Sequence, residues 1–104
     1  MVKDMDVKTL RYFLAVAQEG TITRAAETLR MAQPPLSRQM QLLEEELGVT
    51  LFVRGKRNIS LTEEGIFLKQ QAEEIIGLLE KTQNQLGKIK TSTHGTISLG
   101  VTET

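Results

Sequence analysis

A few polar side chains near the middle of the chain have the chemistry to read base pairs and to hold phosphates. Gln33, Ser37 and Arg38 surround the pair Pro34-Pro35. A Gln amide can bond bidentately to adenine, an Arg guanidinium to guanine, and an exposed Pro can contact the methyl group of thymine. Proline suits the first turn of a helix, where its missing N–H would be unpaired anyway. We therefore predict a helix whose first turns present these five residues to DNA.

The apolar residues around them predict two short helices joined by a tight turn. In residues 22–29 the apolar positions fall at i, i+3, i+4 and i+7, and in residues 33–47 they repeat at spacings of four, three and four. Only residues 30–32 separate the two patterns. Helices joined in this way form a helix-turn-helix, whose second helix can enter the DNA major groove. The alternative is an ordinary helical hairpin with a solvated polar face.

A further helix is expected before this pair. Asp6 is its candidate N-cap and Gly20 its C-terminal stop, with an apolar stripe between them. Either Thr21 or Thr23 can cap the next helix. Thr23 also lies where the first helix of such a motif meets the DNA backbone, so it is a candidate supporting contact.

Three consecutive acids, residues 44–46, occupy the end of the second helix, before its predicted stop at Gly48. The helix dipole disfavours acids at this end by a few tenths of a kcal/mol. We expect the acids to be solvated or to pair between subunits.

Two apolar triplets, residues 51–53 and 59–61, flank a short basic loop with Gly and Asn, which predicts a β-hairpin. Beside a helix-turn-helix, such a hairpin is a wing that can reach phosphates or the minor groove. Arg54, Lys56 and Arg57 supply the charge. Arg54 and Arg57 are the sharper candidates, because Arg inserts into a narrow minor groove more readily than the heavily hydrated Lys. A solvated turn is the alternative.

A long helix is predicted over residues 62–90, capped by Thr62. Its apolar positions alternate spacings of four and three, as in a coiled coil. About 28 residues at 1.5 Å each make a rod of roughly 42 Å, too long for one small domain to cover. We predict a dimerisation helix, since no partner for an intramolecular hairpin is evident. Its seam comprises Leu68, Ala72, Ile75, Leu79, Thr82, Leu86 and Ile89.

Residues 91–95 are rich in turn formers, and residues 96–101 alternate like a strand with nothing to pair with. They suggest the opening of a second domain, so we expect the chain to be a fragment. The predicted organisation is a DNA-binding domain over 1–61, a linker helix over 62–90, and a hinge with a first strand over 91–104.

Composition excludes several other classes of protein. The chain of 104 residues has 13 basic and 13 acidic residues and no cysteine. A disulfide framework and cysteine metal sites are therefore excluded, and the neutral balance means that local patches must attract any polyanion. No long apolar run or signal peptide is present, which favours a cytoplasmic protein without a membrane segment. Nothing indicates an enzyme, a metal or a cofactor. A protein-interaction module or an RNA-binding wing remain as rivals.

The chain resembles the N-terminal DNA-binding domain of LysR-type transcriptional regulators. The similarity runs in order through LRYFLAVAQEGTITRAAETL, AQPPLSRQMQLLEEELGVTLFVR, the basic turn, LTEEG and GTISLGV. QPPLSRQ is closest to the branch that controls aromatic and carboxylate catabolism. The resemblance implies a mainly α winged helix-turn-helix followed by a linker helix that pairs with its symmetry mate.

The resemblance also implies the DNA contacts and the partners. The family's contacts fall on Gln33, Pro34, Pro35, Ser37, Arg38 and Arg57, with Thr23 and Arg54 in support. Double-stranded DNA with an interrupted palindrome is the expected target, bound by a homodimer. In the family a further domain binds a small-molecule inducer and the full-length protein is usually a tetramer. Only the first strand of that domain would lie in this chain.

Overall fold

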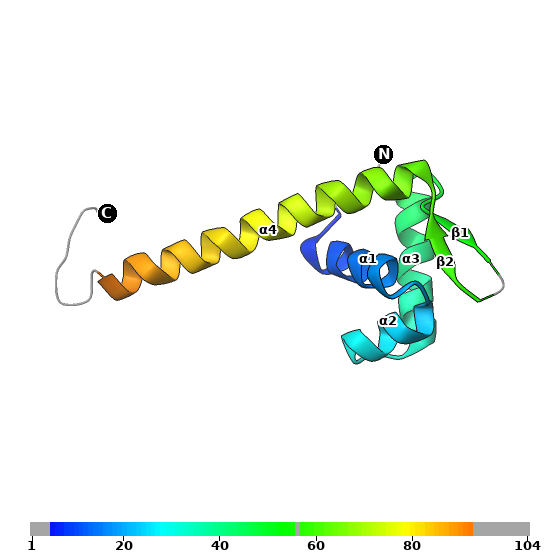
Figure 1. Ribbon diagram of the computed structural model, residues 1–104, viewed down its shortest axis with the longest axis horizontal. Helices are drawn as coiled ribbons and strands as arrows, with labels where there is room; N and C mark the ends of the chain where they lie inside the picture. The colour runs from blue at the N-terminus through cyan, green and yellow to red at the C-terminus, as the bar shows by residue number, and fades with distance from the viewer. Residues whose placement is uncertain (1–4, 56, 93–104) are drawn as a thin grey trace.

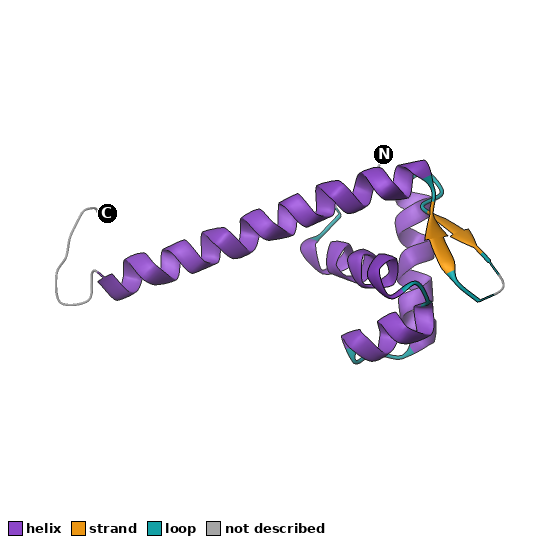
Figure 2. Cartoon of the chain, in the orientation of Figure 1, coloured by secondary structure: helices purple, strands orange, loops and turns teal. Residues whose placement is uncertain are grey.

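A computed structural model of the protein describes residues 5–55 and 57–92. Figure 1 shows a compact helical body, a hairpin along one side of it, and a long helix that extends away as a rod. Figure 2 shows that the described part is mostly helical. The mainly α winged helix-turn-helix with a long following helix is thereby confirmed. The elements are α1 (Val7–Glu19), α2 (Ile22–Leu29), α3 (Gln33–Leu47), β1 (Phe52–Arg54), β2 (Ile59–Leu61) and α4 (Glu63–Ser92).

The helix ends follow local chemistry. Asp6 caps α1, because its carboxylate accepts a hydrogen bond from the Thr9 amide at 2.8 Å, which lowers the pKa of Asp6. Gly20 ends the helix in the left-handed conformation, with φ of 79°. Of the two candidate caps for α2, Thr21 takes the role, accepting from the Arg24 amide at 3.1 Å.

A small core fixes α3 against the rest of the body. The Phe13 ring is fully buried and lies 5.4 Å from the Phe52 ring, centroid to centroid, at an interplanar angle of 44°. The tilted aromatic pair therefore joins α1 to the first strand. No polar or charged side chain is buried among the described residues. The largest fully buried side chains besides Phe13 are Val16, Leu36, Met40, Leu43 and Leu51.

The hairpin forms at the predicted place, with small differences in its bounds. β1 and β2 are antiparallel, with Phe52 opposite Leu61 and Arg54 opposite Ile59. Arg54 therefore belongs to a strand, and the loop begins after it. The Gly55 amide donates to the Asn58 carbonyl at 2.9 Å and closes the turn.

The first half of α4 packs against the body, which corrects part of the predicted seam. Leu68 is 8% exposed and Ala72 is 0% exposed within the single chain, so neither is available to a second copy. α1 supplies the covering helix that the sequence did not reveal. At the edge of this contact, Arg11 of α1 and Glu80 of α4 form an exposed ion pair at 3.3 Å.

A second apolar face of α4 remains uncovered in the chain. Consecutive members are eight and three residues apart, so alternate members are eleven residues apart. Eleven residues are about three helical turns, and the members therefore form a stripe along the rod. Leu79 of the predicted seam is half-buried. The exposed stripe of α4 consists of Phe67, Ile75, Leu78, Leu86 and Ile89.

α4 continues through residues 91–92, which the sequence had assigned to a hinge. The predicted strand at 96–101 and Lys56 of the wing lie outside the described residues. Over the described ranges, no helix combines the length and apolarity needed to cross a membrane.

Gly65 marks the close approach of α4 to the segment before the hairpin. The Thr62 amide donates to the Leu51 carbonyl at 3.0 Å, and the Thr62 hydroxyl caps α4 by accepting from the Gly65 amide at 3.0 Å. A Cβ atom on Gly65 would collide with the Leu51 carbonyl oxygen. Gly77 has open space around it. The two helical glycines therefore have different roles.

This contrast gives a stability prediction. Gly65→Ala is expected to lower the free energy of unfolding by about 1–3 kcal/mol, because backbone must move to admit the methyl group. Gly77→Ala is expected to raise it by about 0.5–1 kcal/mol through helix propensity alone. Urea unfolding of both variants at one protein concentration measures the difference. Equal effects of the two substitutions would contradict the close approach.

Candidate nucleic-acid interface

The structure places the predicted reading residues together on the solvent side of α3. Leu36, Met40 and Leu43 turn inward and are fully or almost fully buried. The opposite face carries the polar residues, so the helix is divided as the sequence predicted. Gln33, Pro34, Pro35 and Arg38 are exposed, and Ser37 is half-buried.

At the start of α3, the side chains are more available to a ligand than the backbone amides are. Ala32 occupies the N-cap position and makes no side-chain hydrogen bond. The two prolines remove two of the N–H groups that normally point out of a helix start. A phosphate at this end would meet few backbone donors, so the groups available to it are mainly the side chains of Gln33, Ser37 and Arg38.

The turn between α2 and α3 is held by an unusual residue. Arg30 has φ of 58° and ψ of 45°, the left-handed conformation that normally favours Gly. Its amide and that of Met31 donate to carbonyls in the last turn of α2, at 3.1 Å and 3.0 Å. This tight turn sets the direction in which α3 leaves α2.

One exposed residue on the same row of α3 escaped sequence reasoning. Gln41 lies four residues after Ser37 and eight after Gln33, so the three side chains share one helix face. Its side chain is exposed. The i, i+4 spacing from Ser37 is the signal in the sequence that identifies Gln41 as a member of this face.

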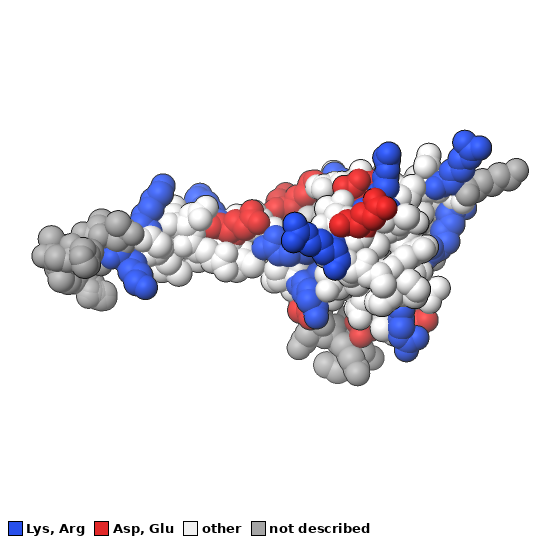
Figure 3. Space-filling view, turned by 90° about the horizontal axis from the view of Figure 1, so that it is seen from below, with Lys and Arg blue, Asp and Glu red and all other residues white. Residues whose placement is uncertain are grey.

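The hairpin adds cationic groups beside α3. Arg54 and Arg57 are exposed, and Figure 3 shows Lys and Arg side chains at this end of the molecule as well as along the rod. In Figure 1 the strands lie beside α3, and the start of α3 lies at the end of the body away from α4. A long polyanion can therefore meet both elements. Thr23 of α2 is also exposed.

Glu44 has a role that its place in an acidic run concealed. Its Oε2 atom accepts hydrogen bonds from the amides of Leu51 and Phe52, at 2.7 Å and 3.2 Å. Its backbone carbonyl accepts from the amides of Gly48 and Val49, at 2.8 Å and 3.2 Å. The expectation of a merely solvated or intersubunit acid is therefore wrong for this residue.

The balance of energies explains why an acid is tolerated at the C-terminal end of α3. The dipole penalty there is a few tenths of a kcal/mol. A hydrogen bond to a charged group contributes about 1.5–3 kcal/mol. Because the Leu51 and Phe52 residues are buried, their amides would otherwise lose water without gaining a partner. The hydrogen bonds therefore outweigh the dipole.

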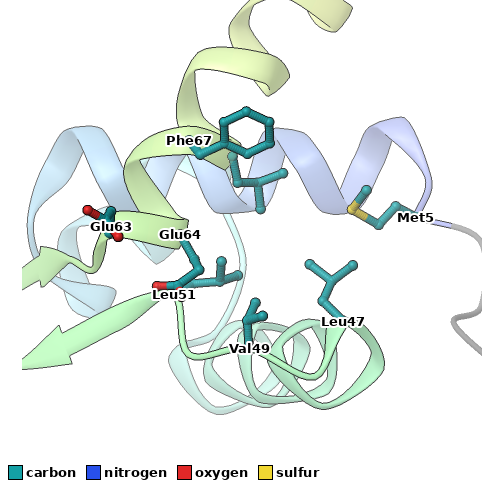
Figure 4. Close-up of a pocket in the computed structure, with 8 residues that line it drawn as sticks. Met5, Leu47, Val49, Leu51, Glu63, Glu64 and Phe67 are labelled. Carbon is teal, nitrogen blue, oxygen red and sulfur yellow. The ribbon is translucent and has the colours of Figure 1, made fainter.

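An apolar groove lies between the end of α3 and the start of α4 (Figure 4). Its volume is about 470 Å³, and Leu47, Val49 and Phe67 form part of its wall. Phe67 is 63% exposed and belongs to the exposed stripe of α4. The groove can accept apolar side chains, and it is separate from the polar face of α3.

The chemistry on these surfaces is that of binding. Within residues 5–55 and 57–92, no cluster of three or more His, Cys, Asp or Glu is arranged to hold a metal. The exposed polar face of α3 combines hydrogen-bond donors and acceptors with a guanidinium, and the wing adds positive charge. Such a surface can recognise base edges and phosphates together.

Comparison with known proteins agrees with this chemistry. The family described as "Bacterial regulatory helix-turn-helix protein, lysR family" matches residues 7–66. The probable cat1 operon transcriptional activator of Acinetobacter lwoffii is 45% identical over 96 residues, which cover 92% of this chain and 32% of that protein. BsdA, an HTH-type transcriptional regulator of Bacillus subtilis (strain 168), is 46% identical over 99 residues, covering 94% and 34%. The chain spans about a third of the length of these curated relatives.

A solved structure extends the similarity to three dimensions. The BenM DBD, in a crystal structure of its complex with catB site 1 DNA, has a TM-score of 0.80 and 44% sequence identity to this chain. The match covers 83% of this chain and 97% of that one.

Proposed function

This chain belongs to the lysR family of bacterial regulatory helix-turn-helix proteins, and on that premise we propose that it binds double-stranded DNA at specific sequences to regulate transcription. The observation that carries the proposal is the division of α3 into a buried apolar face and a polar face with exposed Gln33 and Arg38 and half-buried Ser37. That face has the width and chemistry to lie in the major groove. The likeness to a DNA-bound domain supports this orientation.

Each exposed residue at the start of α3 has a defined role in the proposal. Gln33 pairs with adenine and Arg38 with guanine, while Pro34 and Pro35 contact a thymine methyl group. Ser37 is half-buried at the edge of this face and donates to a phosphate. The first group sets sequence preference, and the phosphate contact sets position.

The wing and α2 complete the contact in the proposal. Arg57 enters the adjacent minor groove, where a narrow A·T-rich stretch concentrates negative potential. Arg54 on β1 and Thr23 on α2 contact phosphates on either side of the recognition helix. The exposure of all three side chains supports these roles.

We also propose that the chain acts as a homodimer through α4. The exposed stripe is a row of apolar side chains along one face of the helix that water covers in the single chain. Residues 63–80 carry five acids and one Lys, whereas residues 81–92 carry three Lys and no acid. Antiparallel pairing centred on Leu78 sets the acidic half of each helix against the basic half of the other. It also sets Ile89 of one copy near Phe67 and the groove of the other.

A twofold dimer implies a twofold operator. Two recognition helices would occupy major grooves one or more helical turns apart, and one turn is about 34 Å. The operator is therefore an interrupted palindrome. In the full-length protein we place inducer binding and tetramer formation outside the described residues, in the two thirds of the relatives that this chain does not span.

The first test is selection of sites from a random duplex library, followed by substitution of Gln33. Gln33→Ala is expected to weaken binding to the selected site by about 1–3 kcal/mol and to relax preference at one base position. The control Gln70→Ala removes an exposed amide from α4 and should leave affinity unchanged. Affinity is measured by fluorescence anisotropy at two salt concentrations.

Two outcomes would count against the proposal. Failure to recover any palindromic motif, with only weak binding to all duplexes, would refute sequence-specific recognition by this chain. If Gln33→Ala instead lost as much affinity for random DNA as for the selected site, base reading by that side chain would be refuted.

The dimer has its own test. Leu86→Glu places a charge in the exposed stripe and is expected to convert the dimer to a monomer, because burying an unpaired carboxylate is unfavourable. Asn84→Glu adds the same charge to the opposite face of the same turns and should keep the dimer. Sedimentation velocity at equal concentrations distinguishes the two. An unchanged mass for Leu86→Glu would refute pairing through the stripe.

A further inference from the structure

We propose that Glu44 is the positioning residue that locks the wing to the recognition helix, and so sets the spacing between the bases read in the major groove and the minor-groove segment beside them. The inference rests on the proposed function, because this spacing has meaning only on DNA. It assigns Glu44 a part in site selection without any contact with DNA.

Glu44 accepts most of the backbone hydrogen bonds donated by the segment that connects α3 to β1. A single carboxylate oxygen accepts from the Leu51 and Phe52 amides, at 2.7 Å and 3.2 Å, while the backbone carbonyl holds the Gly48 and Val49 amides. Four of the five amides from residue 48 to residue 52 therefore end at Glu44. The first residue of the wing cannot shift relative to α3 without breaking these bonds.

The other attachments of the hairpin lead elsewhere in the molecule. The Ile59 amide donates to the Gly20 carbonyl at 2.7 Å, which ties β2 to the turn between α1 and α2. The Thr62 amide donates to the Leu51 carbonyl, which ties the base of the hairpin to α4. Within the described residues, the hydrogen bonds that join the hairpin to α3 are those at Glu44.

The position of Glu44 separates this role from base reading. It lies eleven residues after Gln33, about 16 Å along the helix axis, at the C-terminal end of α3 and away from the reading residues of the first turns. Leu51 and Phe52 are 1% and 4% exposed, so water cannot replace the carboxylate as their acceptor without local opening. Loss of Glu44 should therefore release the wing while the reading end of α3 stays in place.

The first experiment measures this release without DNA. Amide hydrogen exchange of Leu51 and Phe52 is followed by NMR in the wild type, Glu44→Ala and Glu44→Gln. We expect exchange at these two amides to accelerate on the order of tenfold in Glu44→Ala, since each loses its acceptor, while amides of α1 keep their rates. Glu44→Gln retains an acceptor oxygen and should restore most of the protection. Unchanged exchange in Glu44→Ala would overturn the proposal.

The second experiment measures binding to the selected operator in a double-mutant cycle. Glu44→Ala should weaken binding on the order of tenfold, as Arg57→Ala does, and the double variant should be no weaker, because both remove the same wing contact. Preference for A·T at the flanking minor-groove position should fall, while the base preference set by Gln33 persists. Glu45→Ala removes the same charge from an exposed neighbour, and it should change neither the affinity for the operator nor the A·T preference.

Additive losses, or an equal loss of both preferences, would show that Glu44 acts through overall stability and would overturn the proposal. If Glu44→Ala does not fold, Glu44→Gln replaces it in the same cycle. Any loss of operator affinity in Glu44→Gln that adds to the loss in Arg57→Ala would refute the coupling of Glu44 to the wing contact. Failure of the wild type to bind any operator would refute the proposed function instead, and the exchange experiment would still test the lock itself.

Discussion

The structure depends on the way one residue, Leu51, is held from three sides. Its side chain is fully buried in the core, its amide donates to Glu44 of α3, and its carbonyl accepts from Thr62 at the start of α4. Gly65 permits the helix backbone to come this close. The recognition helix, the wing and the linker helix therefore meet at a single residue. A change in the angle of any one of them must alter the hydrogen bonds of the other two.

Local patterns were enough to predict the elements. Apolar spacings located α2 and α3, the Gly20 and Gly48 stops ended the right helices, and the basic loop between apolar triplets gave the hairpin. These features depend on contacts within a few residues, which the sequence displays directly. The face of α3 that bears Gln33 and Arg38 followed for the same reason, because the positions of Leu36 and Met40 fix the opposite face.

What the sequence could not provide were contacts between distant residues. The apolar positions of α4 form two faces, and periodicity alone merged them into one seam. Only the packing of α1 shows that Leu68 and Ala72 belong inside while Phe67 and Leu78 stay outside. Glu44 is the same kind of case, since its bonds to Leu51 and Phe52 require the chain to turn back after Gly48. An acidic run does not reveal which of its members has a partner.

If the chain pairs through α4 as proposed, the uncovered outer half of this helix links the amount of protein to DNA binding. Residues 80–90 are exposed, and an isolated helical segment of this length is marginal in water. Pairing with a second copy would then stabilise this part of the helix, so that the stability of the rod follows mass action. Operator occupancy would rise more steeply than the first power of concentration. The stripe would thus set a threshold abundance, below which regulated promoters stay empty and above which they fill over a narrow range.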